Sequence, residues 1–297
     1  MKKLLVMALT AMIVISAFGP AQAFADSAPG DVIVTLGANL TPDQRKAMIS
    51  EMDIDQNSAQ IVEVTNSEEH KYLDKYLSPS QIGTRAISSS KITLGKQGSG
   101  LSARTHNITY VTKDMYINAL ATAGVKDADV YITAPFPVSG TAALTGMIKA
   151  YEVKTGEVIP EKQKQVANEE VVVTSEIGNK DGVGKQKAAE LVTEIKDQMA
   201  KNTPDSRADV EQIVRDSVNQ VNVNLNDADI QKLIDLFDKM RTIHIDWNQV
   251  GDQMQQVKDQ LNKVAGSDQA KGFFAEVLTA IGNFFSAIFD AIASLFK

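Results

Sequence analysis

The segment from Ser88 to Tyr151 constrains the fold more than any other part of the chain. Apolar and polar residues alternate in its first third as they do in strands, and the remainder carries apolar residues first at helical, then at strand, then again at helical spacing. Thr112 can cap the first helix, and Gly124 can end it in the left-handed conformation. The predicted elements are strands over 91–94 and 101–108, a helix over 112–123, a strand over 130–134 and a helix from Ser139-Gly140-Thr141.

A glycine-rich link joins the first two of these strands. Gly95, Gly98 and Gly100 can supply the positive φ values of a tight turn, so the link predicts a β-hairpin. A phosphate cradle is the other reading of such glycines. It is disfavoured because the link lacks a following Gly-Lys-Ser/Thr and joins a strand to a strand.

The residues before this segment add two more strand–helix units. Val32–Leu36 is a near-continuous apolar run, as in central strands, and Thr41-Pro42-Asp43 is a strong helix start. A strand over 60–65 and a helix over 67–77 follow. The order predicts an α/β (α+β) domain with a mixed sheet over residues 26–156.

Beyond residue 157 the composition changes to Gln, Lys, Glu, Asp and Asn on a 3.6-residue apolar period. This pattern predicts an all-α helical region over residues 157–270. Trp247, the only tryptophan, falls in a link between two helices, where core packing is its expected role. The predicted helices cover 161–177, 185–201, 206–221, 227–240 and 248–264.

The first 25 residues have the pattern of a secretory signal peptide. Lys2 and Lys3 precede an uncharged apolar run, and Ala23-Phe24-Ala25 places small residues where signal peptidase requires them. We therefore expect cleavage before Asp26 and a product that is secreted or held at the cell envelope.

Charge and cysteine content exclude several classes of function. The net charge is −7, and removal of two lysines with the signal leaves −9, which argues against nucleic acid as a partner. The chain has no cysteine, so it has no disulfides, no thiol catalysis and no Cys-ligated zinc.

The C-terminal segment 271–297 is a strongly amphipathic, Phe-rich helix by its pattern. Its uncharged run between Glu276 and Asp290 is 13 residues, short of the ~20 that a spanning helix needs. Such an apolar face must be covered by the chain itself, a second copy, a membrane surface or a partner. The candidate contact residues are Phe274, Ile281, Phe285 and Phe289.

One constellation suggests catalysis. Ser88-x-x-Lys91, Tyr116-x-Asn118 and Lys154-Thr155-Gly156 occur in the order that marks penicillin-recognising serine acyl-enzymes. This predicts, as an alternative function, a secreted serine hydrolase acting on cell-wall material through Ser88, Lys91, Asn118 and Lys154. Against it, the serine leads into a strand instead of opening a helix, and the motifs stand too close together for an intervening helical domain.

Candidate ion sites are few. Ser139, Gly140 and Thr141 start a helix, where free N–H groups favour an anion, although ordinary capping is the favoured explanation. The loop from Asp53 starts like an EF-hand but lacks its glycine and its final glutamate. His70 and Asp74 share a helix face and His106 lies on a strand, both expected at the surface, so we predict no metal and no cofactor.

Five stretches of the chain carry a family resemblance. They are VIVTLGA at 32–38, IGTRAISSS at 82–90, GSGL at 98–101, AGVKDA at 123–128 and APFPVSGTAALTG at 134–146. These stretches resemble the YpuA-like family of exported Gram-positive proteins, a family of unknown function. The resemblance extends over nearly all of the mature chain and implies secretion and a shared fold, but no catalytic residue. We therefore expect a non-enzymatic binding or interaction protein, whose partner is an unknown protein or envelope component.

Overall fold

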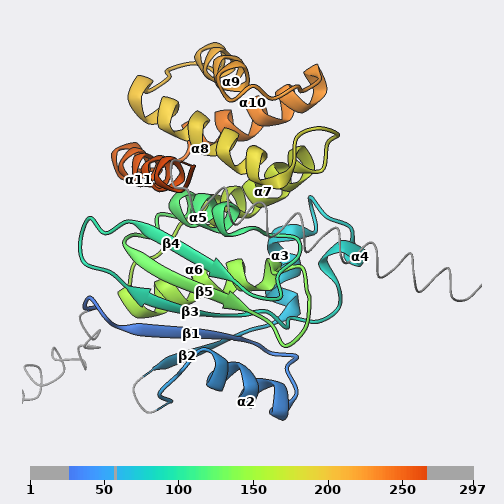
Figure 1. Ribbon diagram of the computed structural model, residues 1–297, viewed down its shortest axis with the longest axis vertical. Coiled ribbons are helices and arrows are strands. Elements are labelled where there is room, and N and C mark those ends of the chain that lie inside the picture. Colours follow the sequence, from blue (N-terminus) through green and yellow to red (C-terminus); the bar gives the residue numbers. More distant parts are fainter. Residues whose placement is uncertain (1–26, 57–58, 266–297) are drawn as a thin grey trace, which may run out of the picture.

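A computed structural model describes residues 27–56 and 59–265 of the chain. Its N-terminal part is a five-stranded mixed sheet and its C-terminal part is helical, which confirms the predicted fold class (Figure 1). The strand order is β2-β1-β3-β5-β4. The strands are β1 (Val32–Gly37), β2 (Gln60–Val64), β3 (Ser89–Leu94), β4 (Leu101–Thr105) and β5 (Ala128–Thr133).

The predicted hairpin between β3 and β4 is wrong, because β5 lies between these two strands. β3 pairs with β5 in the antiparallel sense and β4 pairs with β5 in the parallel sense. The glycine link instead passes the start of β5, where the Gly95 N–H donates to the Asp127 carbonyl at 2.6 Å and the Gly100 N–H to the Asp127 carboxylate at 2.8 Å. A glycine turn permits a hairpin but does not select the strand's neighbour.

Capping boxes begin three of the helices in the N-terminal half. Thr41 caps α2 (Pro42–Glu51), as predicted, with Gln44 closing the box. Helix α3 (Asn66–Leu73) begins one residue before the predicted start at 67, since Thr65 and Glu68 form its box, and it ends four residues before the predicted end at 77. Pro79 then opens the short α4 (Pro79–Ile82).

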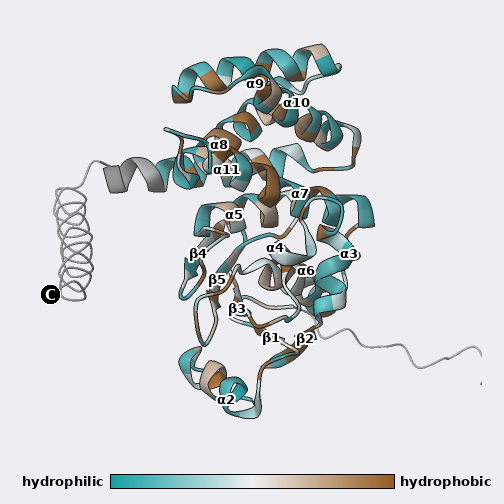
Figure 2. Cartoon of the chain, turned by 90° about the vertical axis from the view of Figure 1, so that its right-hand side faces the viewer, coloured by the Kyte–Doolittle hydropathy of each residue, from teal (hydrophilic) through white to brown (hydrophobic). Residues whose placement is uncertain are grey.

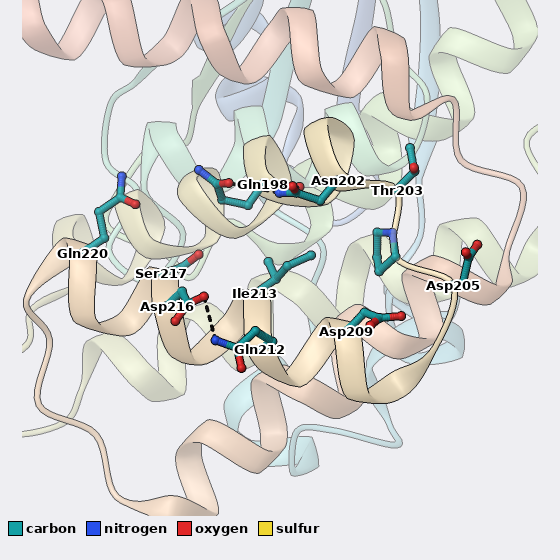
Figure 3. A pocket seen from close by; sticks show the side chains of 11 residues that line it. Gln198, Asn202, Thr203, Asp205, Asp209, Gln212, Ile213, Asp216, Ser217 and Gln220 are labelled. Carbon is teal, nitrogen blue, oxygen red and sulfur yellow. Dashed lines mark hydrogen bonds between the residues drawn. The ribbon is translucent and has the colours of Figure 1, made fainter.

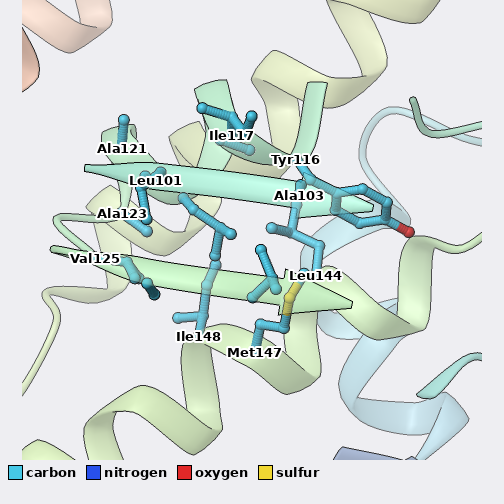
Figure 4. Packing of buried hydrophobic residues seen from close by; sticks show 14 of the residues in the cluster. Leu101, Ala103, Tyr116, Ile117, Ala121, Ala123, Val125, Leu144, Met147 and Ile148 are labelled. Atoms are coloured by element: carbon cyan, nitrogen blue, oxygen red, sulfur yellow. The ribbon is translucent and has the colours of Figure 1, made fainter. Parts of the chain in front are cut away.

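One face of the sheet packs against α6 (Thr141–Thr155), and the β4 edge packs against α5 (Lys113–Thr122). Leu144, Met147 and Ile148 of α6 share one buried cluster with Leu101 and Ala103 of β4 (Figure 4). On the other face, α2 covers only the part of the sheet around β1 and β2 (Figure 1).

The C-terminal helices stack on α5, on the far side from the sheet (Figure 1). These helices are α7 (Glu161–Gly178), α8 (Lys185–Asn202), α9 (Arg207–Val221), α10 (Asp227–Thr242) and α11 (Trp247–Ala265). Apolar residues are interspersed with polar ones along α8, α9 and α10, as amphipathic helices require (Figure 2). No helix in the described ranges is both long and apolar enough to cross a membrane.

The core is continuous across the predicted boundary near residue 157. The cluster that holds the sheet residues also contains Ala167 of α7, Ala189 of α8 and Met254 of α11. Trp247 packs against both this cluster and that of the outer helices. The predicted signal peptide and the tail, with Phe274, Ile281, Phe285 and Phe289, lie outside the described residues.

Candidate functional site

The structure does not bring together the four residues of the acyl-enzyme pattern. The Ser88 hydroxyl accepts a hydrogen bond from the Ala143 N–H of α6 at 3.0 Å. Lys91 reaches the end of α2, on the opposite sheet face, where its ammonium donates to the Met52 carbonyl at 2.9 Å. Side chains three apart on a strand point to opposite faces, which explains the separation.

Asn118 and Lys154 also have separate structural roles. Asn118 is buried on α5, and its amide donates to the Thr193 hydroxyl at 3.0 Å. Lys154 forms an ion pair with Asp31 at 2.8 Å, at the entry to β1.

A buried ion pair lies beside Asn118, between α7 and α8. The Lys196 ammonium is 2.6 Å from the Glu170 carboxylate and donates to the Asn118 carbonyl at 2.6 Å. Thr122 donates to the other Glu170 oxygen at 2.5 Å. Burial lowers the pKa of Lys196, and the Glu170 charge opposes this shift. The cluster joins three helices, α5, α7 and α8.

The predicted anion site at the start of α6 faces a carboxylate of the chain itself. Gly140 is the N-cap, with a φ of 92°. The Thr141 hydroxyl donates to the Glu69 carboxylate, and the Ser139 hydroxyl lies 3.0 Å from that of Thr141. Burial raises the pKa of Glu69, although the Thr141 and Asn66 hydrogen bonds oppose the rise.

Two of the three histidines pair with carboxylates. His70 lies 2.6 Å from Asp74 on α3, and His106 lies 2.9 Å from Glu51. The same Glu51 oxygen accepts from Tyr131 at 2.8 Å and from Thr133 at 2.7 Å. In the part of the chain that the structure describes, no group of three or more acidic or histidine side chains could hold a metal ion.

A pocket of about 220 Å³ lies where α3, α6 and α7 meet; we call it the α3–α6–α7 pocket. It combines a charged rim with a polar and apolar floor. The rim consists of three lysines and three glutamates, Lys71, Lys149, Lys164, Glu68, Glu152 and Glu161.

Ion pairs order the rim. Lys149 contacts Glu68 at 2.6 Å, and Lys164, whose side chain is only 12% exposed, contacts Glu152 at 2.8 Å. Lys71 contacts Glu161 at 2.8 Å.

Two groups of the rim, Glu68 and Lys164, have pKa values shifted in favour of their charged forms. Burial alone would raise the pKa of Glu68, but hydrogen bonds from Lys149 and Thr65 outweigh it and lower that pKa. Burial would lower the pKa of Lys164, but hydrogen bonds to Glu152 and Glu161 raise it. The rim therefore presents both signs of charge.

Two polar atoms on the floor have no hydrogen-bond partner among the described residues. They are Thr145 Oγ1 and Asn168 Oδ1, in side chains that are 4% and 1% exposed. The Asn168 amide nitrogen donates a hydrogen bond to the Lys164 carbonyl at 2.8 Å, while the Asn168 side-chain oxygen has no donor among the described residues. Buried polar groups are nearly always paired, so an unpaired hydroxyl and an unpaired acceptor beside Ile148 indicate a binding site.

The sequence pattern gave little sign of this pocket. Its lysines and glutamates recur at helical spacing on three separate helices, which is the pattern of solvated helix faces. Thr145 and Asn168 within otherwise apolar helix faces were the only local signals.

The comparisons with known proteins agree with the family resemblance. A family model described as "Protein of unknown function (DUF1002)" matches residues 36–257. The chain is 53% identical over 279 residues, which is 94% of each chain, to the protein of Bacillus subtilis (strain 168) named "Uncharacterized protein YpuA". No solved structure matches the chain. With most of its length covered by the family model and by this relative, the chain belongs to the DUF1002 family of YpuA-like proteins.

Proposed function

We propose that the chain is an exported, non-enzymatic binding protein that takes a small zwitterionic ligand in the α3–α6–α7 pocket. One observation carries the proposal. The rim of the pocket holds both positive and negative side chains, and its floor holds two atoms without a hydrogen-bond partner among the described residues, Thr145 Oγ1 and Asn168 Oδ1. Export is supported by the sequence of residues 1–25.

The chemistry of the pocket matches a molecule of amino-acid size. Its 220 Å³ equals the share of about seven water molecules at roughly 30 Å³ each. A ligand carboxylate would contact the lysines of the rim and a ligand ammonium the glutamates, while an N–H or O–H donor would pair with Asn168 Oδ1.

Location and partners follow from the sequence. The mature protein beginning at Asp26 is secreted or held at the envelope, with no nucleic acid among its partners. Retention, self-association or contact with a membrane surface would act through the Phe-rich tail.

A thermal-shift screen of the mature protein tests the ligand proposal, with the free α-amino acids and alanyl-alanine as probes at millimolar concentration. A ligand at 100 times its Kd stabilises the folded state by about 2.7 kcal/mol. Lys164→Met should remove the shift. Lys162→Met, exposed on the same helix and outside the pocket, should keep it.

Three outcomes would count against the proposal. The first is that no probe raises the melting temperature. The second is an equal rise in Lys164→Met. The third is covalent labelling of Ser88 by a β-lactam, which would support the alternative function as a serine acyl-enzyme. N-terminal sequencing tests export separately, since intact Met1 in the culture medium would contradict cleavage.

A further inference from the structure

A second hollow lies far from this pocket, between α8 and α9 beside the link that joins them. We call it the α8–α9 groove; its volume is about 640 Å³. Figure 3 shows Gln198 and Asn202 of α8 across from Gln212, Ile213 and Asp216 of α9. No described helix covers it.

The lining restricts the ligands that could bind. It includes Asp205, Asp209 and Asp216 but no lysine, arginine, histidine or aromatic side chain. Arg241, outside the lining, donates to the Asp205 carbonyl at 3.0 Å. The lining itself holds three carboxylates and no cation, which disfavours phosphates and acidic peptides. Amides and hydroxyls make up most of the remaining lining, so a purely apolar ligand would leave them unpaired.

A buried hydroxyl provides an independent sign of a ligand. Ser217 is 0% exposed and lines the groove, yet its Oγ has no hydrogen-bond partner in the ranges the structure describes. A serine within a helix commonly bonds a carbonyl of the preceding turn. Here that bond is absent, and the hydroxyl is left for a partner in the groove.

The amide groups of the groove are held in place before a ligand arrives. The Asn202 amide donates to the Gln198 carbonyl at 2.8 Å, and the Gln212 amide donates to the Asp216 carboxylate at 2.9 Å. The Asn202 amide nitrogen also donates to Gln198 Oε1 at 3.2 Å. The Gln212 amide keeps a second N–H, and the oxygens of Asn202 and Asp216 keep accepting capacity. Neighbouring donors and acceptors of this kind match vicinal hydroxyl groups, which each donate and accept.

We propose that the α8–α9 groove binds a glycan, a neutral polyhydroxylated chain whose hydroxyls pair with the amides, carboxylates and Ser217. Ile213, 8% exposed, supplies an apolar contact for the C–H face of a sugar ring. A metal ion would need grouped carboxylates, and the described residues hold no such group. This proposal is independent of the α3–α6–α7 pocket, because the two sites share no residue.

The test is titration calorimetry of the mature protein with chitotetraose and cellotetraose. Ser217→Ala and Gln212→Ala should each weaken binding about tenfold or more. The matched control is Gln231→Ala, which removes the same Gln–Asp contact at i, i+4 from α10, outside the groove. It should bind within about twofold of the wild type. Ser217→Ala removes an unpaired hydroxyl, so it should fold normally by circular dichroism.

Ca²⁺ and spermidine serve as the competing probes. Binding of either one, with neither oligosaccharide bound at millimolar concentration, would overturn the proposal. So would oligosaccharide binding that is equal in the two groove variants and the control. Binding that is lost in both groove variants and kept in Gln231→Ala would support it.

Discussion

Three buried glutamates of this chain are held in three different ways. Glu170 pairs with the Lys196 ammonium, and Glu169 accepts from Tyr76 at 3.0 Å and contacts Lys239. Burial, together with the Glu169 charge, raises the pKa of Tyr76 to about 12. Among these three, Glu69 is the one that the described residues pair with hydroxyl and amide donors and not with a lysine ammonium, so its charge is the least compensated.

Glu69 should make stability depend on pH. Its folded-state pKa is raised by burial above the ordinary 4.5, so the native state binds the proton more tightly than the unfolded chain. Stability is therefore present below that value and falls as pH rises through the raised pKa. Glu69→Gln, neutral throughout, should gain stability relative to wild type as pH rises above the ordinary carboxyl pKa of 4.5. Parallel pH profiles in urea unfolding would contradict this.

The Lys196–Glu170 pair should be costly to break. Lys196→Met leaves a buried carboxylate without its ammonium, and we expect a loss of about 3–5 kcal/mol in the free energy of unfolding. The exposed pair Arg215–Glu211 on α9 is the control, and Arg215→Ala should cost less than about 1 kcal/mol. Equal losses in the free energy of unfolding for the two variants would mean that breaking the buried pair costs no more than breaking an exposed one, which would contradict the prediction.

At the scale of elements, α6 depends on a glycine for its approach to the sheet. A Cβ on Gly146 would lie 2.5 Å from Val64 Cγ2 and 3.1 Å from the Thr35 side chain. Gly146→Ala gains about 1 kcal/mol of helix propensity, but the overpacking costs about 1–3 kcal/mol. The net effect should be a lower melting temperature, and an unchanged or higher one would contradict the close packing.

Local signals accounted for most elements and failed on strand pairing. Thr41, Thr112 and Ser206 cap the helices that the sequence predicted for them, since capping depends on neighbouring residues. The β3–β4 hairpin failed because β5, which lies later in the chain, forms the intervening pairs. Pairing partners are set by packing between distant segments, which the alternation within one strand does not encode.

The candidate sites were harder to predict than the elements, for the same reason. The α3–α6–α7 pocket needs three helices to meet, and no single helix supplies more than four of its ten lining residues. The acyl-enzyme pattern shows the converse, because its motifs stand in the expected order and fold to separate places.

For the whole molecule, the pattern of the Phe-rich segment 271–297 predicts an apolar face that must be covered, by the chain itself, a second copy, a membrane surface or a partner. Burying each of its twelve large apolar side chains is worth about 1.5–3 kcal/mol. Deletion of residues 273–297 should lower the melting temperature if the tail packs on its own chain. If it is a docking device, stability should hold while self-association or envelope retention falls. A deletion that changes none of these would contradict every form of the expectation.

We propose that the floor of the α3–α6–α7 pocket binds a ligand, and the variant Thr145→Val tests this proposal. The variant keeps the shape of threonine and removes a buried hydroxyl that has no partner among the described residues, so the free protein should be as stable as wild type or more stable, by up to about 1 kcal/mol. Thr155→Val, on the same helix but with its hydroxyl bonded to the Tyr151 carbonyl at 2.8 Å, is the control.

The measurement is titration calorimetry of both variants with the ligand found in the thermal-shift screen, alongside urea unfolding of the free proteins. We expect Thr145→Val to lose about tenfold or more in ligand affinity without loss of stability, and Thr155→Val to bind the ligand as the wild type does. Unchanged affinity in Thr145→Val, or a stability loss that matches the affinity loss, would contradict it.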